Sequence, residues 1–141
     1  MIRIVALILP VLMLAGCNYD DDTLLAPVVS FKTDTCYTYN DTTLVYKDSV
    51  LVGITAEPSN DLNLTHFNYT ILEDSVETSV DSGMNTSLFD YERYIRKSSK
   101  NTDKWIFTIR DKGGASASIS IVLNLDTLSA IVSDNNGRTG K

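Results

Sequence analysis

The sequence predicts an all-β fold, in which residues 27–126 form one sandwich of about seven antiparallel strands. Its β-type runs are short, and polar turns separate them at intervals of about 8 to 15 residues. Within several runs, apolar and polar side chains alternate, which is typical of a strand that is buried on one face. One core is usual for about 100 to 150 residues, so the length also favours a single domain.

The first three predicted strands follow a short linker. Residues 28–32 form the first run, and Pro27 suits the residue just before it because no ladder hydrogen bond is lost there. Residues 44–46 form a short edge piece. Residues 49–56 alternate cleanly and place four side chains on one face: Val50, Val52, Ile54 and Ala56.

The middle of the chain gives one clear strand and two weaker ones. Residues 64–72 direct Phe67, Tyr69 and Ile71 to one face and His66, Asn68 and Thr70 to the other. Residues 76–80 are predicted as a weak edge strand, with a turn around Gly83 over residues 81–85. Residues 88–95 are predicted as a strand, and a helix is the competing interpretation because their alternation is less clean.

The strongest signal is a hairpin near the C-terminus. Trp105, Phe107 and Ile109 share one face of its first strand, so core packing is favoured over a sugar-stacking role for Trp105. Gly113 and Gly114 are expected to supply positive φ angles in the turn. The second strand alternates in the same way: Ala115, Ala117, Ile119, Ile121 and Leu123.

This hairpin resembles a known kind of module. Residues 105–118 are similar to the last hairpin of bacterial Ig-like and PKD-like modules, in which an alternating strand ends in Thr-x-x-Asp-x-x-Gly. The resemblance covers about residues 27–125 and implies an Ig-like β-sandwich. It implies no particular activity, because function depends on sites rather than folds.

The N-terminus has the features of a cleaved secretory signal over residues 1–16. Arg3 precedes an apolar run, and small residues lie at the expected scission point. An uncleaved membrane helix is the alternative, but the run is shorter than the roughly 20 residues needed to span a bilayer and contains Pro10. Cys17 directly follows Leu-Ala-Gly, which resembles the bacterial lipobox. This resemblance implies that Cys17 is lipidated and that acyl chains anchor the protein in the outer membrane.

Residues 17–26 are predicted to form a lipidated acidic linker. Asp20, Asp21 and Asp22 follow the lipidated Cys17 closely and resemble the acidic export signal of surface-exposed Bacteroidetes lipoproteins. The hairpin and the lipobox-like Cys17 together make the chain similar to the small Ig-like lipoproteins of that group. The resemblance implies display on the cell exterior, and a periplasm-facing position is the alternative.

The charge of the chain limits its partners. Removal of the signal changes the net charge from −6 to −7, because Arg3 is the only charged residue lost. Nucleic-acid binding needs clustered Lys and Arg, so this acidic balance disfavours it. The expected contacts are the membrane, through the lipid, and a polysaccharide or protein ligand.

No catalytic or metal-binding constellation is recognisable. His66 is the only histidine, which excludes metal sites built on several His. Residues 134–137 resemble a calcium loop only faintly and are predicted as a turn, because no bidentate Glu follows. Cys36 has no predicted internal partner and is expected to be buried, with an intermolecular disulfide or a reactive thiol as the alternative. We therefore expect neither an enzyme nor a cofactor.

Tyrosines in the polar connections are the best candidates for a ligand surface. Tyr37, Tyr39 and Tyr46 lie outside any clean core pattern, and cross-strand aromatic pairs are the alternative. Residues 127–141 are predicted as a tail or an incomplete extra hairpin. The function expected from these features is a lipid-anchored, non-catalytic binding module, in a sharper form an accessory glycan-binding lipoprotein. The alternative is a structural, adhesion or assembly subunit that contacts protein partners.

Overall fold

A computed structural model describes residues 25–74 and 76–127 of the chain. The predictions for the signal peptide, for lipidation at Cys17, for the acidic residues Asp20, Asp21 and Asp22, and for the segment after Thr127 lie outside the described residues. Within them, the structure contains no helix long and apolar enough to cross a membrane.

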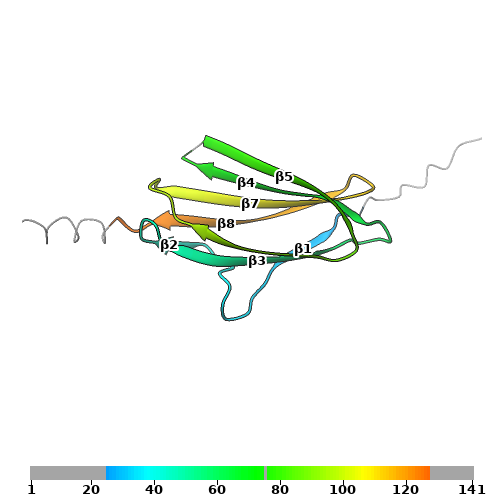
Figure 1. The fold of residues 1–141 in the computed structure, drawn as a ribbon, viewed down its shortest axis with the longest axis horizontal. Coiled ribbons are helices and arrows are strands. Elements are labelled where there is room, and N and C mark those ends of the chain that lie inside the picture. Colours follow the sequence, from blue (N-terminus) through cyan, green and yellow to red (C-terminus); the bar gives the residue numbers. More distant parts are fainter. Residues whose placement is uncertain (1–24, 75, 128–141) are drawn as a thin grey trace, which may run out of the picture.

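The described residues form two β-sheets packed face to face, as Figure 1 shows. The smaller sheet has three strands: β1 (Val28–Phe31), β3 (Ser49–Glu57) and β6 (Phe89–Arg96). The larger sheet has five: β2 (Thr42–Leu44), β4 (Leu64–Glu73), β5 (Val76–Thr86), β7 (Thr102–Asp111) and β8 (Ser116–Leu125). The predicted all-β sandwich is confirmed.

The strand order is β1-β3-β6 in one sheet and β2-β8-β7-β4-β5 in the other. Every pairing is antiparallel except that of β2 with β8, which is parallel, so the prediction of antiparallel strands alone was wrong at this edge. The chain leaves the small sheet after β1 and joins the edge of β8 in the same direction. The Asp126 amide donates to the Leu44 carbonyl at 2.8 Å, and the Val122 amide donates to the Asp41 carboxylate at 2.8 Å.

The core consists of the inward faces that the alternation predicted. Eleven apolar residues are buried between the sheets: Val52, Ile54, Ala56, Leu64, Phe67, Ile95, Trp105, Phe107, Ile109, Ile121 and Leu123. Trp105 is only 6% exposed and stacks near Tyr69 and Phe107, which confirms core packing. Leu64 is buried although simple alternation would place it beside His66 on the outer face. A shift in register between these two residues brings it inward.

Three boundaries differ from the sequence-based expectation. β5 continues to Thr86, so the predicted turn over residues 81–85 was wrong; His66 of β4 pairs with Gly83 and holds it in the strand. β2 ends at Leu44 because residues 45–48 form a turn in which Lys47 has a φ of 76°. In the β7–β8 turn, Gly114 has a φ of 91°, but Gly113 does not have a positive φ. The strand prediction for residues 88–95 is confirmed by β6, and the helical alternative is excluded.

A buried ion pair closes the segment that connects β6 to β7. Lys97 Nζ lies 2.9 Å from Asp103 Oδ2, and their side chains are 0% and 1% exposed. The ammonium also donates to the Lys100 carbonyl at 2.6 Å, while Asp103 accepts from the Ser98 amide and hydroxyl at 2.8 and 2.6 Å. Both charges are therefore compensated by several hydrogen bonds, which a buried pair needs in order to be tolerated.

Removal of one partner of this ion pair should destabilise the fold strongly. We expect Asp103→Ala to lower the free energy of unfolding by about 3 to 5 kcal/mol, because it leaves the Lys97 ammonium buried and unpaired. Chemical denaturation would measure the loss. The matched double variant, Lys97→Met with Asp103→Leu, should cost less than Asp103→Ala because no uncompensated charge remains. A single variant that stays within about 1 kcal/mol of the wild type would contradict this account.

Candidate ligand-binding site

The outer face of the five-stranded sheet carries polar side chains from three neighbouring strands. In the strand register, His66 of β4 lies opposite Arg110 of β7, and Asn68 of β4 lies between Asp81 of β5 and Thr108 of β7. On β4 and β7 these side chains alternate with core residues, so they point away from the core, and Asp81 lies on the same face because it is paired with Asn68. Together, the five line a hollow of about 240 Å³. The sheet thus brings residues far apart in sequence to one place.

Hydrogen bonds hold the middle of this hollow in place. The Asn68 amide nitrogen donates to Ser79 Oγ at 2.8 Å, and the Asn68 amide oxygen accepts from Thr70 Oγ1 at 3.1 Å. The Thr108 hydroxyl lies 2.7 Å from the Ser118 hydroxyl. Asn68 and Thr108 are half-buried, so they form a pre-oriented polar floor rather than mobile surface groups.

Two opposite charges flank this floor without neutralising each other. Arg110 and Asp81 are exposed, and neither forms an ion pair with any residue in the described part of the chain. They lie on β7 and β5, which are separated by β4, so about 10 Å of sheet lies between their strands. His66 is also exposed, with its Nδ1 3.1 Å from Thr65 Oγ1. The hollow therefore offers an unpaired guanidinium, an unpaired carboxylate and a polar floor.

This arrangement suits recognition of a small polar molecule. Its volume is below the roughly 300 to 1,000 Å³ of typical drug-sized pockets, so it has room only for a small group. Among residues 25–74 and 76–127, no group of three or more His, Cys, Asp or Glu is placed to hold a metal ion. No protein-family model and no curated protein matches this chain.

The hollow was not predicted from the sequence. The prediction that His66 and Asn68 lie on the outer face of their strand is confirmed, but the predicted turn at Asp81 was wrong. Which outer side chains become neighbours depends on how β4, β5 and β7 pair. The signal that could have identified the site is the set of polar outward positions in the two best-defined strands.

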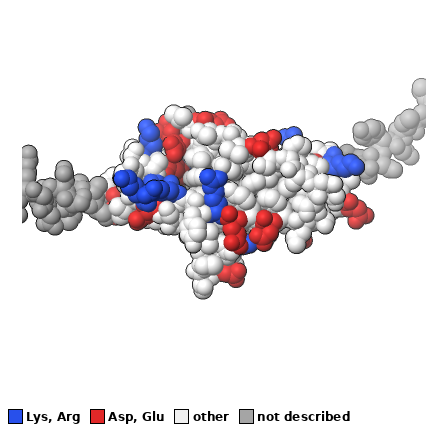
Figure 2. Space-filling model, in the orientation of Figure 1, with Lys and Arg blue, Asp and Glu red and all other residues white. Residues whose placement is uncertain are grey.

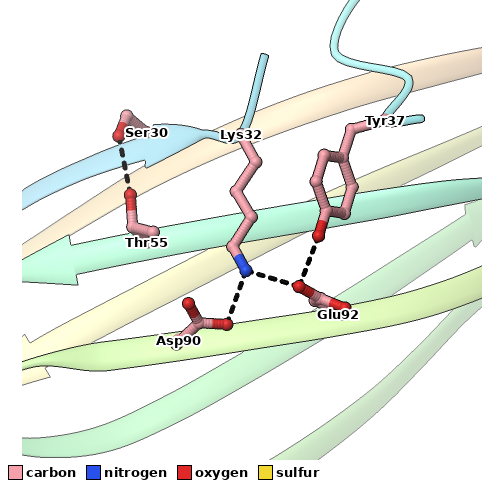
Figure 3. Close-up of polar contacts among 6 residues, drawn as sticks. All are labelled: Ser30, Lys32, Tyr37, Thr55, Asp90 and Glu92. Atoms are coloured by element: carbon pink, nitrogen blue, oxygen red, sulfur yellow. Dashed lines mark hydrogen bonds and ion pairs between the residues drawn. The ribbon is translucent and has the colours of Figure 1, made fainter. Parts of the chain in front are cut away.

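A second polar cluster lies on the outer face of the small sheet and involves Tyr37 (Figure 3). Lys32 Nζ lies 2.7 Å from Asp90 Oδ1 and 2.6 Å from Glu92 Oε1, and the Tyr37 hydroxyl also donates to Glu92. The Tyr37 ring lies so close to Gly53 that a Cβ atom at Gly53 would be 2.7 Å from a ring carbon. Tyr37 therefore holds the β1–β2 connection across the sheet.

The same contacts shift the proton affinities of the cluster. Hydrogen bonds from Lys32 and Tyr37 lower the pKa of the Glu92 carboxyl, because they favour its charged form. Hydrogen bonds to Asp90 and Glu92 raise the pKa of Lys32, and the hydrogen bond to Glu92 raises that of Tyr37. This cluster acts as an electrostatic clamp on the connection.

The three predicted ligand-surface tyrosines have different environments. Tyr37 is engaged in the clamp, whereas Tyr39 and Tyr46 are 43% and 49% exposed. The Tyr46 ring lies 5.1 Å from Lys47 Nζ. In the described part of the chain, the aromatic contacts include none that joins these three rings. A ligand role for Tyr39 and Tyr46 stays a prediction.

Cys36 is exposed, so the expectation that it is buried was wrong. It lies in the β1–β2 connection, which projects away from the two sheets (Figure 1). A side chain in such a projecting segment has no core to enter.

On the face shown in Figure 2, basic side chains are interspersed with acidic ones rather than gathered into one continuous patch.

The clamp should make stability depend on acidic pH. Because the pKa of Glu92 is lowered in the folded state, its contribution is present above the ordinary value of 4.5 and is lost as the pH falls through the lower folded value. We expect Glu92→Gln to lower the melting temperature slightly at pH 7, and the difference from the wild type to shrink below pH 4.5. Thermal melts over this pH range would measure both effects.

The matched control for this experiment is Asp61→Asn, which removes an exposed carboxylate outside the clamp. Its melting temperature should follow the wild type throughout. If the Glu92→Gln difference stayed constant as the pH fell, the ionised clamp would not be its cause.

Proposed function

We propose that this protein is a lipid-anchored, surface-exposed, non-catalytic binding module that recognises a glycan through the hollow on its five-stranded sheet. The anchor and its exposure rest on the lipobox-like Cys17 and the acidic residues that follow it. The observation that carries the binding role is the hollow, where five polar side chains from β4, β5 and β7 converge.

We also propose that the sandwich is of the Ig-like type. The chain crosses between sheets after β1, β2, β3, β5 and β6, which gives one sheet of β1-β3-β6 and another that contains the neighbours β8-β7-β4. Ig-like modules likewise divide seven to nine strands, roughly, between two sheets joined by such crossing connections. The hairpin of β7 and β8 is the part that resembles bacterial modules in sequence.

The chemistry of the hollow supports a sugar as its ligand. Sugar hydroxyls both donate and accept hydrogen bonds, so they need a site of mixed character. Arg110 offers donors, Asp81 offers acceptors, and the floor residue Thr108 carries a hydroxyl that can do either. A binding role is proposed rather than a catalytic one, because the sequence contains no recognisable catalytic motif.

The second candidate is an assembly or adhesion subunit that contacts protein partners. It is favoured by a separate feature, the strand β5, which forms an edge of the larger sheet and is exposed along most of its length. Exposed edges are sites where another chain can add a strand.

A polysaccharide screen by affinity electrophoresis tests the proposed function. It would use soluble protein beginning at Asn18 and a panel of neutral and acidic polysaccharides. We expect at least one polysaccharide to retard the protein, and we expect Arg110→Ala to weaken the binding roughly tenfold or more, because hydrogen bonds to a charged group contribute about 1.5 to 3 kcal/mol. Asn68→Ala should weaken it as well.

The matched controls are Tyr39→Ala and Tyr46→Ala, which alter exposed aromatic groups outside the hollow. They should leave the retardation unchanged. If binding disappeared in a tyrosine variant but persisted in Arg110→Ala, the site would belong to the tyrosines. If folded protein were retarded by no polysaccharide, glycan binding would be rejected.

A further inference from the structure

The strand β5 is an unusually open edge of the larger sheet. It has eleven residues, more than any other strand, and it pairs with β4 on one side. All eight residues from Val76 to Gly83 are exposed, and they pair with Glu73 to His66 without a register shift. A strand of this length that is paired on one side only presents unpaired amide and carbonyl groups on its other side.

The other edge strands of the sandwich have features that disfavour pairing with another chain. β1 and β2 have only four and three residues, and Pro27 precedes β1. β6 carries two acidic and two basic side chains along its length. Short length, proline and abundant charge are the features that usually prevent an edge from pairing with another chain. β5 has neither proline, lysine nor arginine.

The two faces of β5 differ in character. Glu77 and Asp81 alternate with Ser79 and point to the outer, polar side of the sheet. Val76 and Val80 point to the opposite side, where they are 64% and 40% exposed. The register places Val80 opposite Tyr69, so a strand added here could extend the apolar surface beside Tyr69.

From this alternation, we propose that β5 is a docking edge for an extended segment of a partner protein that alternates basic with aliphatic residues. The segment would add a sixth strand to the five-stranded sheet. Its main chain would satisfy the open groups of β5, its basic side chains would lie beside Glu77 and Asp81, and its aliphatic side chains would pack beside Val76 and Val80. This proposal does not rest on the proposed glycan binding, although Asp81 borders both surfaces.

A second copy of β5 is a poorer occupant of this edge. Two copies would bring four carboxylates to the outer side with no opposite charge between them, because Glu77 and Asp81 are the only charged residues of the strand. In the register centred on Ser79, Glu77 would face Asp81 directly. Like charges placed directly opposite destabilise a strand pair. The charge pattern therefore selects a basic partner rather than self-association.

The test uses the whole chain that follows the predicted signal peptide, with Cys17 replaced by Ser. The probe is a labelled synthetic peptide of about eight residues that alternates Lys with Val, compared with a peptide of the same composition in which the alternation is broken. Fluorescence anisotropy would measure the affinity, and amide hydrogen exchange would locate the contact. We expect only the alternating peptide to bind and to slow amide exchange in β5.

Two variants separate strand addition from general attraction between opposite charges. Val80→Lys should weaken binding at least tenfold, because it removes an apolar contact and adds a repelling charge. Asp34→Asn raises the net charge by the same single unit and lies in the β1–β2 connection, away from β5. It should change the affinity less than twofold.

Several outcomes would overturn the proposal. Binding of both peptides with equal affinity, or equal loss in Val80→Lys and Asp34→Asn, would show attraction by charge alone. Protection of β2 rather than β5, or absence of binding to folded protein, would exclude this edge. A dimer protected at β5 without peptide would identify a second copy as the occupant. None of these results decides the polysaccharide screen, which uses no peptide and is read through Arg110 of β7 and Asn68 of β4.

Discussion

The contact of Phe67 with the opposite sheet is the interaction on which the sandwich depends. Its ring lies 4.6 Å from that of Tyr91 and 4.7 Å from that of Phe89, between centroids, and it is stacked with Phe107 of its own sheet at 6.5 Å. Rings at these separations contribute both apolar burial and favourable ring geometry. Because one aromatic side chain of β4 engages two of β6, the two sheets are held in a particular relative position.

Because the core is packed between the sheets, the side chains on their outer faces are not constrained by core packing. A strand with one buried face has an opposite face that no core constrains, so polar side chains there can be arranged for recognition. On the larger sheet, these positions form the hollow around Asn68. On the smaller sheet, they form the clamp of Lys32, Glu92 and Tyr37 that fixes the β1–β2 connection. The same alternation of side chains thus places a hollow on the larger sheet and a clamp on the smaller sheet.

The predictions were reliable where a strand alternated cleanly and had neighbours on both sides. The faces of β3, β4 and β7 were all assigned correctly, including the burial of Trp105. They failed where tertiary pairing overrode a local signal: Gly83 is a residue typical of turns but is held in β5 by pairing with His66. Cys36 has a residue type that is often buried, yet its segment projects from the fold, which composition does not reveal.

The sequence by itself determined the all-β class, the identity of most core residues and the features expected of a lipid anchor, because each depends on residue types over a short stretch. Only the tertiary structure decided which outer side chains meet, as Asn68, Asp81 and Thr108 do, and which strand is left as an open edge. Both depend on strand order and register. Strand order and register are set by pairing between segments far apart in the chain. The alternation of side chains along one strand does not indicate which strands lie beside it.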